Sequence, residues 1–300
     1  MTNAKEIKRK ISSIQNTAKI TKAMELISTV KMKKAQDKAL SKKEFVIEML
    51  KVFYRIQSSL SDFELFSKKT EWKTLAIVIT SNKGLCWGYN INVLKRIKKY
   101  VDNNKDEKID YISMWKKAAL FVTRTWNNLI ADYSDDFSDN FNTHQANQVM
   151  EDVLKHFLSE DYKKVVIFYN HFVNSIKQIP VARDFLPIDK KGIEKYLEKV
   201  IANEKVIYDI KQDITEYTVE PSLEIVAQEV IPLILDMMFY DILLEAKASE
   251  HSARMVAMKA AKDSANSIAK KLTLAYNKAR QAMITKEVSE IVSWVEALKD

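Results

Sequence analysis

Few residues of this chain have the types and spacing that chemistry requires. Gly84 and Gly88 lie between an apolar run and a helical pattern, where a phosphate-binding turn would stand, but they form neither a GxGxxG pattern nor a GKS/T ending. Cys86 lacks the local signature of an activated nucleophile, so we expect a packed free thiol. The four histidines have no metal-ligand spacing, and Asp135 and Asp136 fall in a polar segment. The sequence therefore predicts no catalytic residue, no metal site and no cofactor.

Composition and charge narrow the class of protein. With 47% hydrophobic residues the chain is able to bury a core, yet no run reaches the roughly 18 apolar residues of a membrane span. The first residues lack the apolar core of a secretory signal, and a single cysteine fits a reducing compartment. Residues 1–43 hold 12 Lys/Arg against 3 Asp/Glu, a net charge of +9, so the rest of the chain sums to −1 of the total of +8. Such a segment is typical of binding to nucleic acid, to an anionic membrane or to an acidic protein.

The two ends of the chain have the pattern of very long helices. All glycines and prolines lie between Gly84 and Pro232, and these are the residues that normally end or bend helices. Heptad spacing predicts one helix over residues 4–60 and another over 222–298, about 85 and 115 Å long at the α-helical rise. The first helix would carry three successive seams. These are Ala4, Ile7, Ile11, Ile14, Ala18 and Thr21; then Ile20, Met24, Ile27 and Val30; then Val46, Leu50, Phe53 and Leu60.

The end of the second helix is apolar nearly all round. A helix of that kind is normally buried, so one that projects beyond a coiled coil needs a sheath supplied by something else. Folding back onto its own domain is the alternative that periodicity alone leaves open. The residues concerned are Ile284, Val288, Ile291, Val292, Trp294 and Val295.

The middle of the chain alternates between strand and helix patterns. This alternation favours βαβ units with a largely parallel sheet covered by helices. Residues 133–142 are expected to be a polar, exposed loop, and Pro187 and Gly192 to mark another loop. The predicted strands are 75–80, 109–114, 165–169, 173–183 and 205–219, and the predicted helices are 91–101, 116–127 and 144–158.

Several motifs resemble the gamma subunit of F-type ATP synthases. The run LEAKASEHSARMVAMKAA from Leu244 to Ala261 looks like that family's signature, and YNKARQAMITKE from Tyr276 to Glu287 continues it. Residues 14–24, Asn82–Cys86 with Asn90–Asn92, and Glu220–Ser222 are similar to the family's other motifs, in the same order. The resemblance implies an α/β fold, in which the N- and C-terminal helices form a long antiparallel coiled coil with a Rossmann-like side domain. It places the N-terminal helix at 1–65, the side domain at 66–220 and the C-terminal helix at 221–300.

The resemblance also implies partners. The coiled coil would be the rotor shaft inside a ring of alpha and beta subunits, with catalysis in the beta subunits, and epsilon and a membrane c-ring would lie at the foot. The chain itself would be non-catalytic, peripheral at the cytoplasmic face of a bacterial membrane, and without a nucleic-acid partner. Residues expected to contact the alpha/beta ring are Lys8, Arg9, Lys10, Met24, Lys31, Lys33, Lys34, Arg280, Gln281, Thr285, Ile291 and Trp294.

The middle domain departs from the family pattern. Trp87 stands where the family has a glycine after the cysteine, and Trp115–Ala119 lacks the glycines of the family's Gly-x-Lys-Gly. In the family this domain meets epsilon and the c-ring. Two hypotheses therefore remain: the shaft of an ion-translocating ATP synthase, or the shaft of a repurposed rotary ATPase, for example in bacterial motility, without a c-ring.

Overall fold

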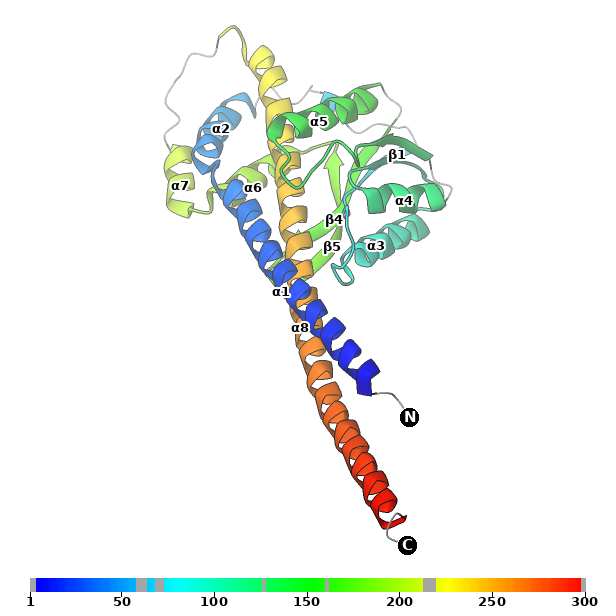
Figure 1. The fold of residues 1–300 in the computed structure, drawn as a ribbon. Helices are drawn as coiled ribbons and strands as arrows, with labels where there is room; N and C mark the ends of the chain where they lie inside the picture. The colour runs from blue at the N-terminus through cyan, green and yellow to red at the C-terminus, as the bar shows by residue number, and fades with distance from the viewer. Residues whose placement is uncertain are drawn as a thin grey trace. The chain divides into compact units, whose positions relative to one another are not determined.

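The computed structural model describes residues 4–57, 64–67, 73–125, 128–159, 162–212 and 220–297 (Figure 1). The chain forms two compact units, a terminal unit of residues up to Thr29 with those from Arg254 onward, and a central unit of Val30–Ala253. The sequence instead predicted boundaries at residues 65 and 220. The difference arises because helix α2 (Lys43–Ile56) and the first part of helix α8 (Leu223–Ala297) contribute side chains to the core of the central unit.

The central unit contains a five-stranded sheet in the order β3-β2-β1-β4-β5. Pairs β1–β2, β2–β3 and β1–β4 are parallel, and β5 joins antiparallel to β4. The sheet is therefore largely parallel, as predicted, although β3 was not foreseen. The strands are β1 (Lys73–Val78), β2 (Lys108–Ser113), β3 (Asn128–Asp132), β4 (Lys164–Phe172) and β5 (Gln178–Leu186).

Helices cover both faces of this sheet, which makes it doubly wound. On one face, α3 (Tyr89–Asn103) and α4 (Lys116–Arg124) pack on Ala76, Val78 and Val166. On the other face, α2 (Lys43–Ile56), α5 (Thr143–Leu158), α6 (Lys190–Ile201) and part of α8 share the larger core. The alternation of strand side chains between the two cores follows from the period of two along each strand. The short 3-10 helix η2 (Glu64–Phe66) and helix α7 (Glu204–Gln212) complete the unit.

The C-terminal helix is the most regular part of the chain. Helix α8 runs without a break over Leu223–Ala297, close to the predicted 222–298, with Pro232 inside it. Its first turns supply Ile231, Ile234, Leu235 and Phe239 to the core of the central unit. Tyr89 donates a hydrogen bond of 2.9 Å to the carbonyl of Ala246, where glycine-loop and helix motifs meet.

The N-terminal helix is not one rod, contrary to the prediction of a helix over 4–60. Helix α1 ends at Leu40, and α2 begins at Lys43 after a turn that contains neither glycine nor proline. Lys42 in this turn forms an ion pair with Asp241 and donates to the Tyr196 hydroxyl at 3.3 Å. The break turns the third predicted seam into core: Val46, Leu50 and Phe53 are buried, and Leu60 lies outside the described residues.

The second predicted seam is also wrong. Ile20, Ile27 and Val30 are exposed, whereas burial continues along the first heptad pattern through Ala18, Thr21 and Ser28. In the terminal unit, α1 lies antiparallel to α8 (Figure 1), and Lys262 pairs with Glu25 at 2.7 Å. The buried positions of α8 in this unit include Met258, Ala265 and Ala269. Ile20 and Ile27 of α1 lie off the buried side of the helix and are exposed.

Two further predictions fail in the segment 187–212. The predicted loop at Gly192 is the start of α6, whose cap Asp189 accepts a hydrogen bond of 2.5 Å from the Gly192 amide. A Cβ at Gly192 would lie 2.5 Å from that carboxylate, which explains the glycine. The predicted strand 205–219 begins as α7, in which Val206, Ile207 and Ile210 follow helical spacing, and residues 213–219 are outside the described part. The β-branched content of the segment suggested a strand, but the spacing of three decided the helix.

Two phenylalanines of α2 test this packing. Phe53 is 1% exposed and Phe45 is 49% exposed. We expect Phe53→Ala to lower the free energy of unfolding by about 3–5 kcal/mol, because it opens a cavity in the core, and Phe45→Ala to cost less than about 1 kcal/mol. Urea denaturation of the full chain measures both. Equal effects would mean that α2 does not pack in the core as described.

Candidate partner-binding surfaces

The end of α8 is an apolar surface that none of the described residues of the terminal unit covers. Every residue from 281 to 295 is exposed, and Trp294 and Ile291 are 73% and 63% exposed. Large exposed apolar areas on this scale mark interaction sites. The exposed apolar residues here are Met283, Ile284, Val288, Ile291, Val292, Trp294 and Val295. The structure thus leaves the predicted tip unsheathed by the part of the chain that it describes.

The polar residues expected to contact a ring are accessible on the same helices. Arg280 and Gln281 are exposed, and the Thr285 hydroxyl donates to the Gln281 carbonyl at 3.0 Å. On α1, Lys8, Arg9 and Lys10 are exposed, and Met24 is half-buried. Lys10 pairs with Glu6 at 2.8 Å, an exposed i,i+4 pair of small energetic weight. Accessibility permits the predicted contacts, which remain predictions.

A second apolar surface lies on α1. Ile20, Leu26, Ile27 and Val30 are all more than half exposed, although the apolar residue Ile7 of the same helix is buried. Periodicity detected three of these residues but assigned them to the coiled coil. Their exposure makes them available to a partner instead.

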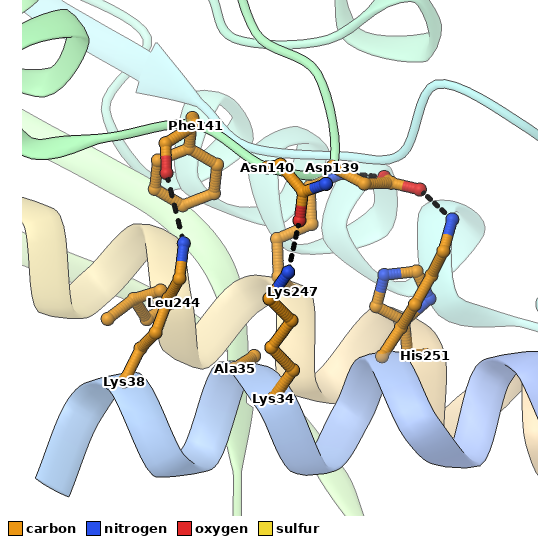
Figure 2. A pocket seen from close by; sticks show the side chains of 10 residues that line it. Lys34, Ala35, Lys38, Asp139, Asn140, Phe141, Leu244, Lys247 and His251 are labelled. Carbon is orange, nitrogen blue, oxygen red and sulfur yellow. Dashed lines mark hydrogen bonds and ion pairs between the residues drawn. The ribbon is translucent and has the colours of Figure 1, made fainter.

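Two of the predicted contact lysines are engaged within the central unit. Figure 2 shows lysines of α1 reaching the loop 133–142: Lys34 donates to the Asn140 side chain at 3.1 Å and Lys38 to the Phe141 carbonyl at 3.4 Å. Lys31 forms an ion pair of 2.5 Å with Asp139. Lys33, between them, is exposed. Part of the basic charge of α1 therefore serves to hold a loop of its own chain.

The same loop is held from the other side by α8. Lys247, whose side chain is 3% exposed, pairs with Glu250 at 2.9 Å and with Asp139 at 3.3 Å. Its ammonium group lies 4.1 Å from the ring centre of Trp115, a cation–π contact. Burial alone would raise the pKa of Asp139, but the hydrogen bond from Lys31 and the charge of Lys247 outweigh it and hold that pKa well below its usual range.

The loop 133–142 is exposed at most of its polar residues, as predicted, but the burial of its two phenylalanines was not predicted. Phe137 and Phe141 are buried, and both rings pack edge-on or tilted against Trp115 or each other. The indole nitrogen of Trp115 donates to the Phe137 carbonyl at 3.3 Å. Two phenylalanines four residues apart in a polar segment were the available signal, and the prediction gave more weight to the surrounding Asp, Ser and Asn residues.

The glycine loop after β1 is a structural turn around Cys86. The Cys86 thiol is buried and accepts a hydrogen bond from the Asn90 side chain at 3.5 Å, as expected of a packed thiol. Leu85 and Trp87 have φ of 62° and 53°, in the left-handed region, whereas the two glycines do not. The family's glycine at position 87 fits this conformation, which costs a residue with a side chain more.

Within the described ranges, no group of three or more His, Cys, Asp or Glu side chains is arranged to hold a metal ion. No described helix is long and apolar enough to cross a membrane. The candidate functional residues are therefore those on the exposed surfaces of α1 and α8 and in the loop 133–142.

Asp139→Asn tests the loop attachment. We expect the free energy of unfolding at pH 7 to fall by about 1–2 kcal/mol, the range of a hydrogen bond to a charged group, reduced because the Asp139 side chain is 35% exposed. Because the pKa is lower in the folded state than the unfolded value of about 3.9, the carboxylate stabilises above about pH 4 and loses its effect as the pH falls below it. The difference between wild type and variant should therefore shrink in acid. Urea denaturation from pH 7 to pH 2.5 measures it.

Asp136→Asn in the same loop is the control, since Asp136 is exposed; a change within about 0.5 kcal/mol is expected. A pH-independent loss for Asp139→Asn would contradict the ionic account.

Comparison with known proteins identifies the family. A family model described as ATP synthase matches residues 3–298. The chain is 36% identical to the ATP synthase gamma chain of Halothermothrix orenii over 304 residues and 34% identical to that of Cytophaga hutchinsonii over 310, covering 100% of each chain in both cases.

Solved structures agree in fold. A chain of the Euglena gracilis mitochondrial ATP synthase superposes with a TM-score of 0.61 at 17% identity, covering 99% of this chain and 95% of that one. A chain of the Tetrahymena thermophila mitochondrial ATP synthase central stalk and c-ring gives 0.56 at 24% identity, covering 81% and 99%. The full-length matches confirm the resemblance and do not favour the repurposed motor. The chain therefore belongs to the ATP synthase gamma-chain family and is a non-catalytic subunit of that enzyme.

Proposed function

We propose that this chain is the rotating central shaft that couples ATP synthesis and hydrolysis in an alpha/beta ring to ion translocation. The observation that supports this most is the end of α8, where residues 281–295 are all exposed although half of them are apolar. Such a tip needs a sheath from partner subunits. Apolar contacts, which are only weakly directional, suit a sheath that must hold the tip while the tip rotates.

Asymmetry of the rod gives the coupling a physical basis. The rod consists of two different helices, α1, which begins at Ala4, and α8, which continues to Ala297. The two helices present different side chains in different directions. Three otherwise identical catalytic sites would each meet a different face, so that each rotational position favours one combination of open and closed sites. An element shifts such equilibria only through contacts that differ between the states.

Electrostatic contacts would add to this. Lys8, Arg9 and Lys33 are accessible cations of α1 for acidic loops of the ring, while Lys31 and Lys34 also contact the loop 133–142. Met24 on α1, and Arg280, Gln281 and Thr285 on α8, would supply further contacts. Since exposed ion pairs contribute about 0–1 kcal/mol each, torque would come from many contacts acting together.

At the other end, we infer epsilon and a c-ring as partners, and a peripheral position at the cytoplasmic face of the membrane. A tagged pull-down of the chain from gently solubilised native membranes tests this, with partners identified by mass. Recovery of alpha, beta, epsilon and c-ring subunits supports the proposal. Recovery without alpha and beta would overturn it.

The tip itself is tested by the double variant Ile291→Ser with Trp294→Ser. We expect at least about tenfold weaker association with an isolated alpha/beta ring, because two exposed apolar anchors are lost. The measurement is the amount of chain retained with the ring on gel filtration over a concentration series.

Glu287→Ser with Glu290→Ser is the matched control, because it makes two replacements by serine at exposed polar positions of the same segment. Retention close to wild type is expected. Equal losses in the two double variants would show that apolar contact does not hold the tip.

A further inference from the structure

Figure 1 shows α3 and α4 on the same face of the sheet. A groove lies between these two helices. Its volume is 490 Å³. Ile91, Leu94 and Val101 of α3 and Phe121 of α4 line it, and Tyr111 of β2 lies at its floor. The groove belongs entirely to the central unit and to residues that the proposed shaft function does not use.

The outer side of α3 is more apolar than a solvent-facing helix side should be. Val93 and Ile97 are buried against the sheet and satisfy the need of the helix for a core face. Ile91 is nevertheless 56% exposed, and Val101 also lies on the surface. Leu120 of α4 is exposed beside the groove residue Phe121. The core thus leaves a second apolar stripe on these helices without a partner among the described residues.

Every charged residue that lines the groove is a lysine. Lys95 and Lys98 stand on its wall, at the spacing that places them on the same side of α3 as Ile91 and Val101. More widely, α3 carries four Lys/Arg against one Asp, and α4 carries three against none. Burial raises the pKa of Tyr111 to about 12, so the floor is uncharged at neutral pH. An apolar base with purely cationic walls is complementary to an apolar stripe flanked by carboxylates.

We propose that this groove binds an acidic amphipathic α-helix of a partner protein. From Ile91 to Val101 the lining spans about 15 Å of α3, which corresponds to about three turns of a docked helix. Its leucine-like side chains would occupy the groove at i, i+3, i+4 and i+7, and its Glu or Asp side chains would pair with Lys95 and Lys98. The concave shape between two helices favours an inserted helix over a flat membrane surface. The inference goes beyond the proposed shaft function, because none of the residues that line the groove is among those proposed to contact the alpha/beta ring.

The test uses the full-length chain and a fluorescent 18-residue helical peptide with leucine on one face and glutamate on the others. Anisotropy titration measures binding, and peptides with lysine for glutamate, or with alanine for leucine, serve as probes of charge and apolar contact. We expect binding of the acidic leucine peptide only. Ile91→Asp, and separately Lys95→Glu with Lys98→Glu, should each weaken it by about tenfold or more.

Matched control variants lie elsewhere on the central unit. Ile176→Asp alters an apolar residue that is 84% exposed in the β4–β5 turn, and Lys191→Glu with Lys195→Glu reverses two exposed lysines of α6. These variants should bind the peptide as wild type does, and circular dichroism checks that all variants are folded.

Three outcomes would overturn the proposal. One is equal binding of the acidic and basic peptides, and another is equal loss in the groove and control variants. The third is absence of peptide binding together with binding of phosphatidylglycerol vesicles that requires Ile91 and Lys95, which would assign the groove to a membrane surface.

Discussion

The rest of the structure depends on the burial of one face of α8 in the core of the central unit. Ile231, Ile234, Leu235 and Phe239 are fully or almost fully buried there, and each such side chain contributes about 1.5–3 kcal/mol by leaving water. The same unbroken helix then supplies Met258, Ala265 and Ala269 to the seam of the terminal unit. One helix is thus both a core element and half of a coiled coil, and any force on its far end is borne by an element rooted in a core.

Polar contacts complement this burial. Lys247 is an almost fully buried cation, and a buried charge is tolerated only where other charges and hydrogen bonds compensate its desolvation. Glu250, Asp139 and the face of Trp115 supply that compensation from three different elements. Because Asp139 also pairs with Lys31 of α1, the loop 133–142 connects the two long helices where they cross the central unit. These polar contacts therefore hold the loop 133–142 at a specific position and do not extend the apolar core.

The surfaces that remain exposed fall into two kinds. On α1 and at the end of α8, apolar residues are exposed because a long helix has no domain of its own to cover it, as suits a subunit whose sheath belongs to other chains. On α3, apolar residues are exposed although the helix already has a core face, and lysines surround them. The first kind follows from the gamma-family architecture. The second is a property of this side domain.

Local sequence determined the elements whose signal is local. The apolar runs of β1, β2 and β4, the long glycine-free α8 and its apolar end were predicted from periodicity, and the motifs near residues 14–24 and 244–287 indicated the family. Helix α7, by contrast, was missed because its β-branched residues favour a strand, although their spacing of three and four favours the helix that the structure contains.

Tertiary structure alone decided the remaining features. The turn at residues 41–42 has no helix-breaking residue, and it exists because α2 gains a core and Lys42 gains Asp241 as a partner. Which of two overlapping stripes of α1 is buried depends on which side of α1 faces α8, and the apolar pattern of α1 alone does not decide it. The polar loop 133–142 is held in place because a buried lysine 108 residues further along the chain requires its carboxylate. The sequence by itself thus specified the family of this protein, most of its strands and the long helix α8. Pairing between distant residues decided where α1 ends, which faces are buried and which are left for partners.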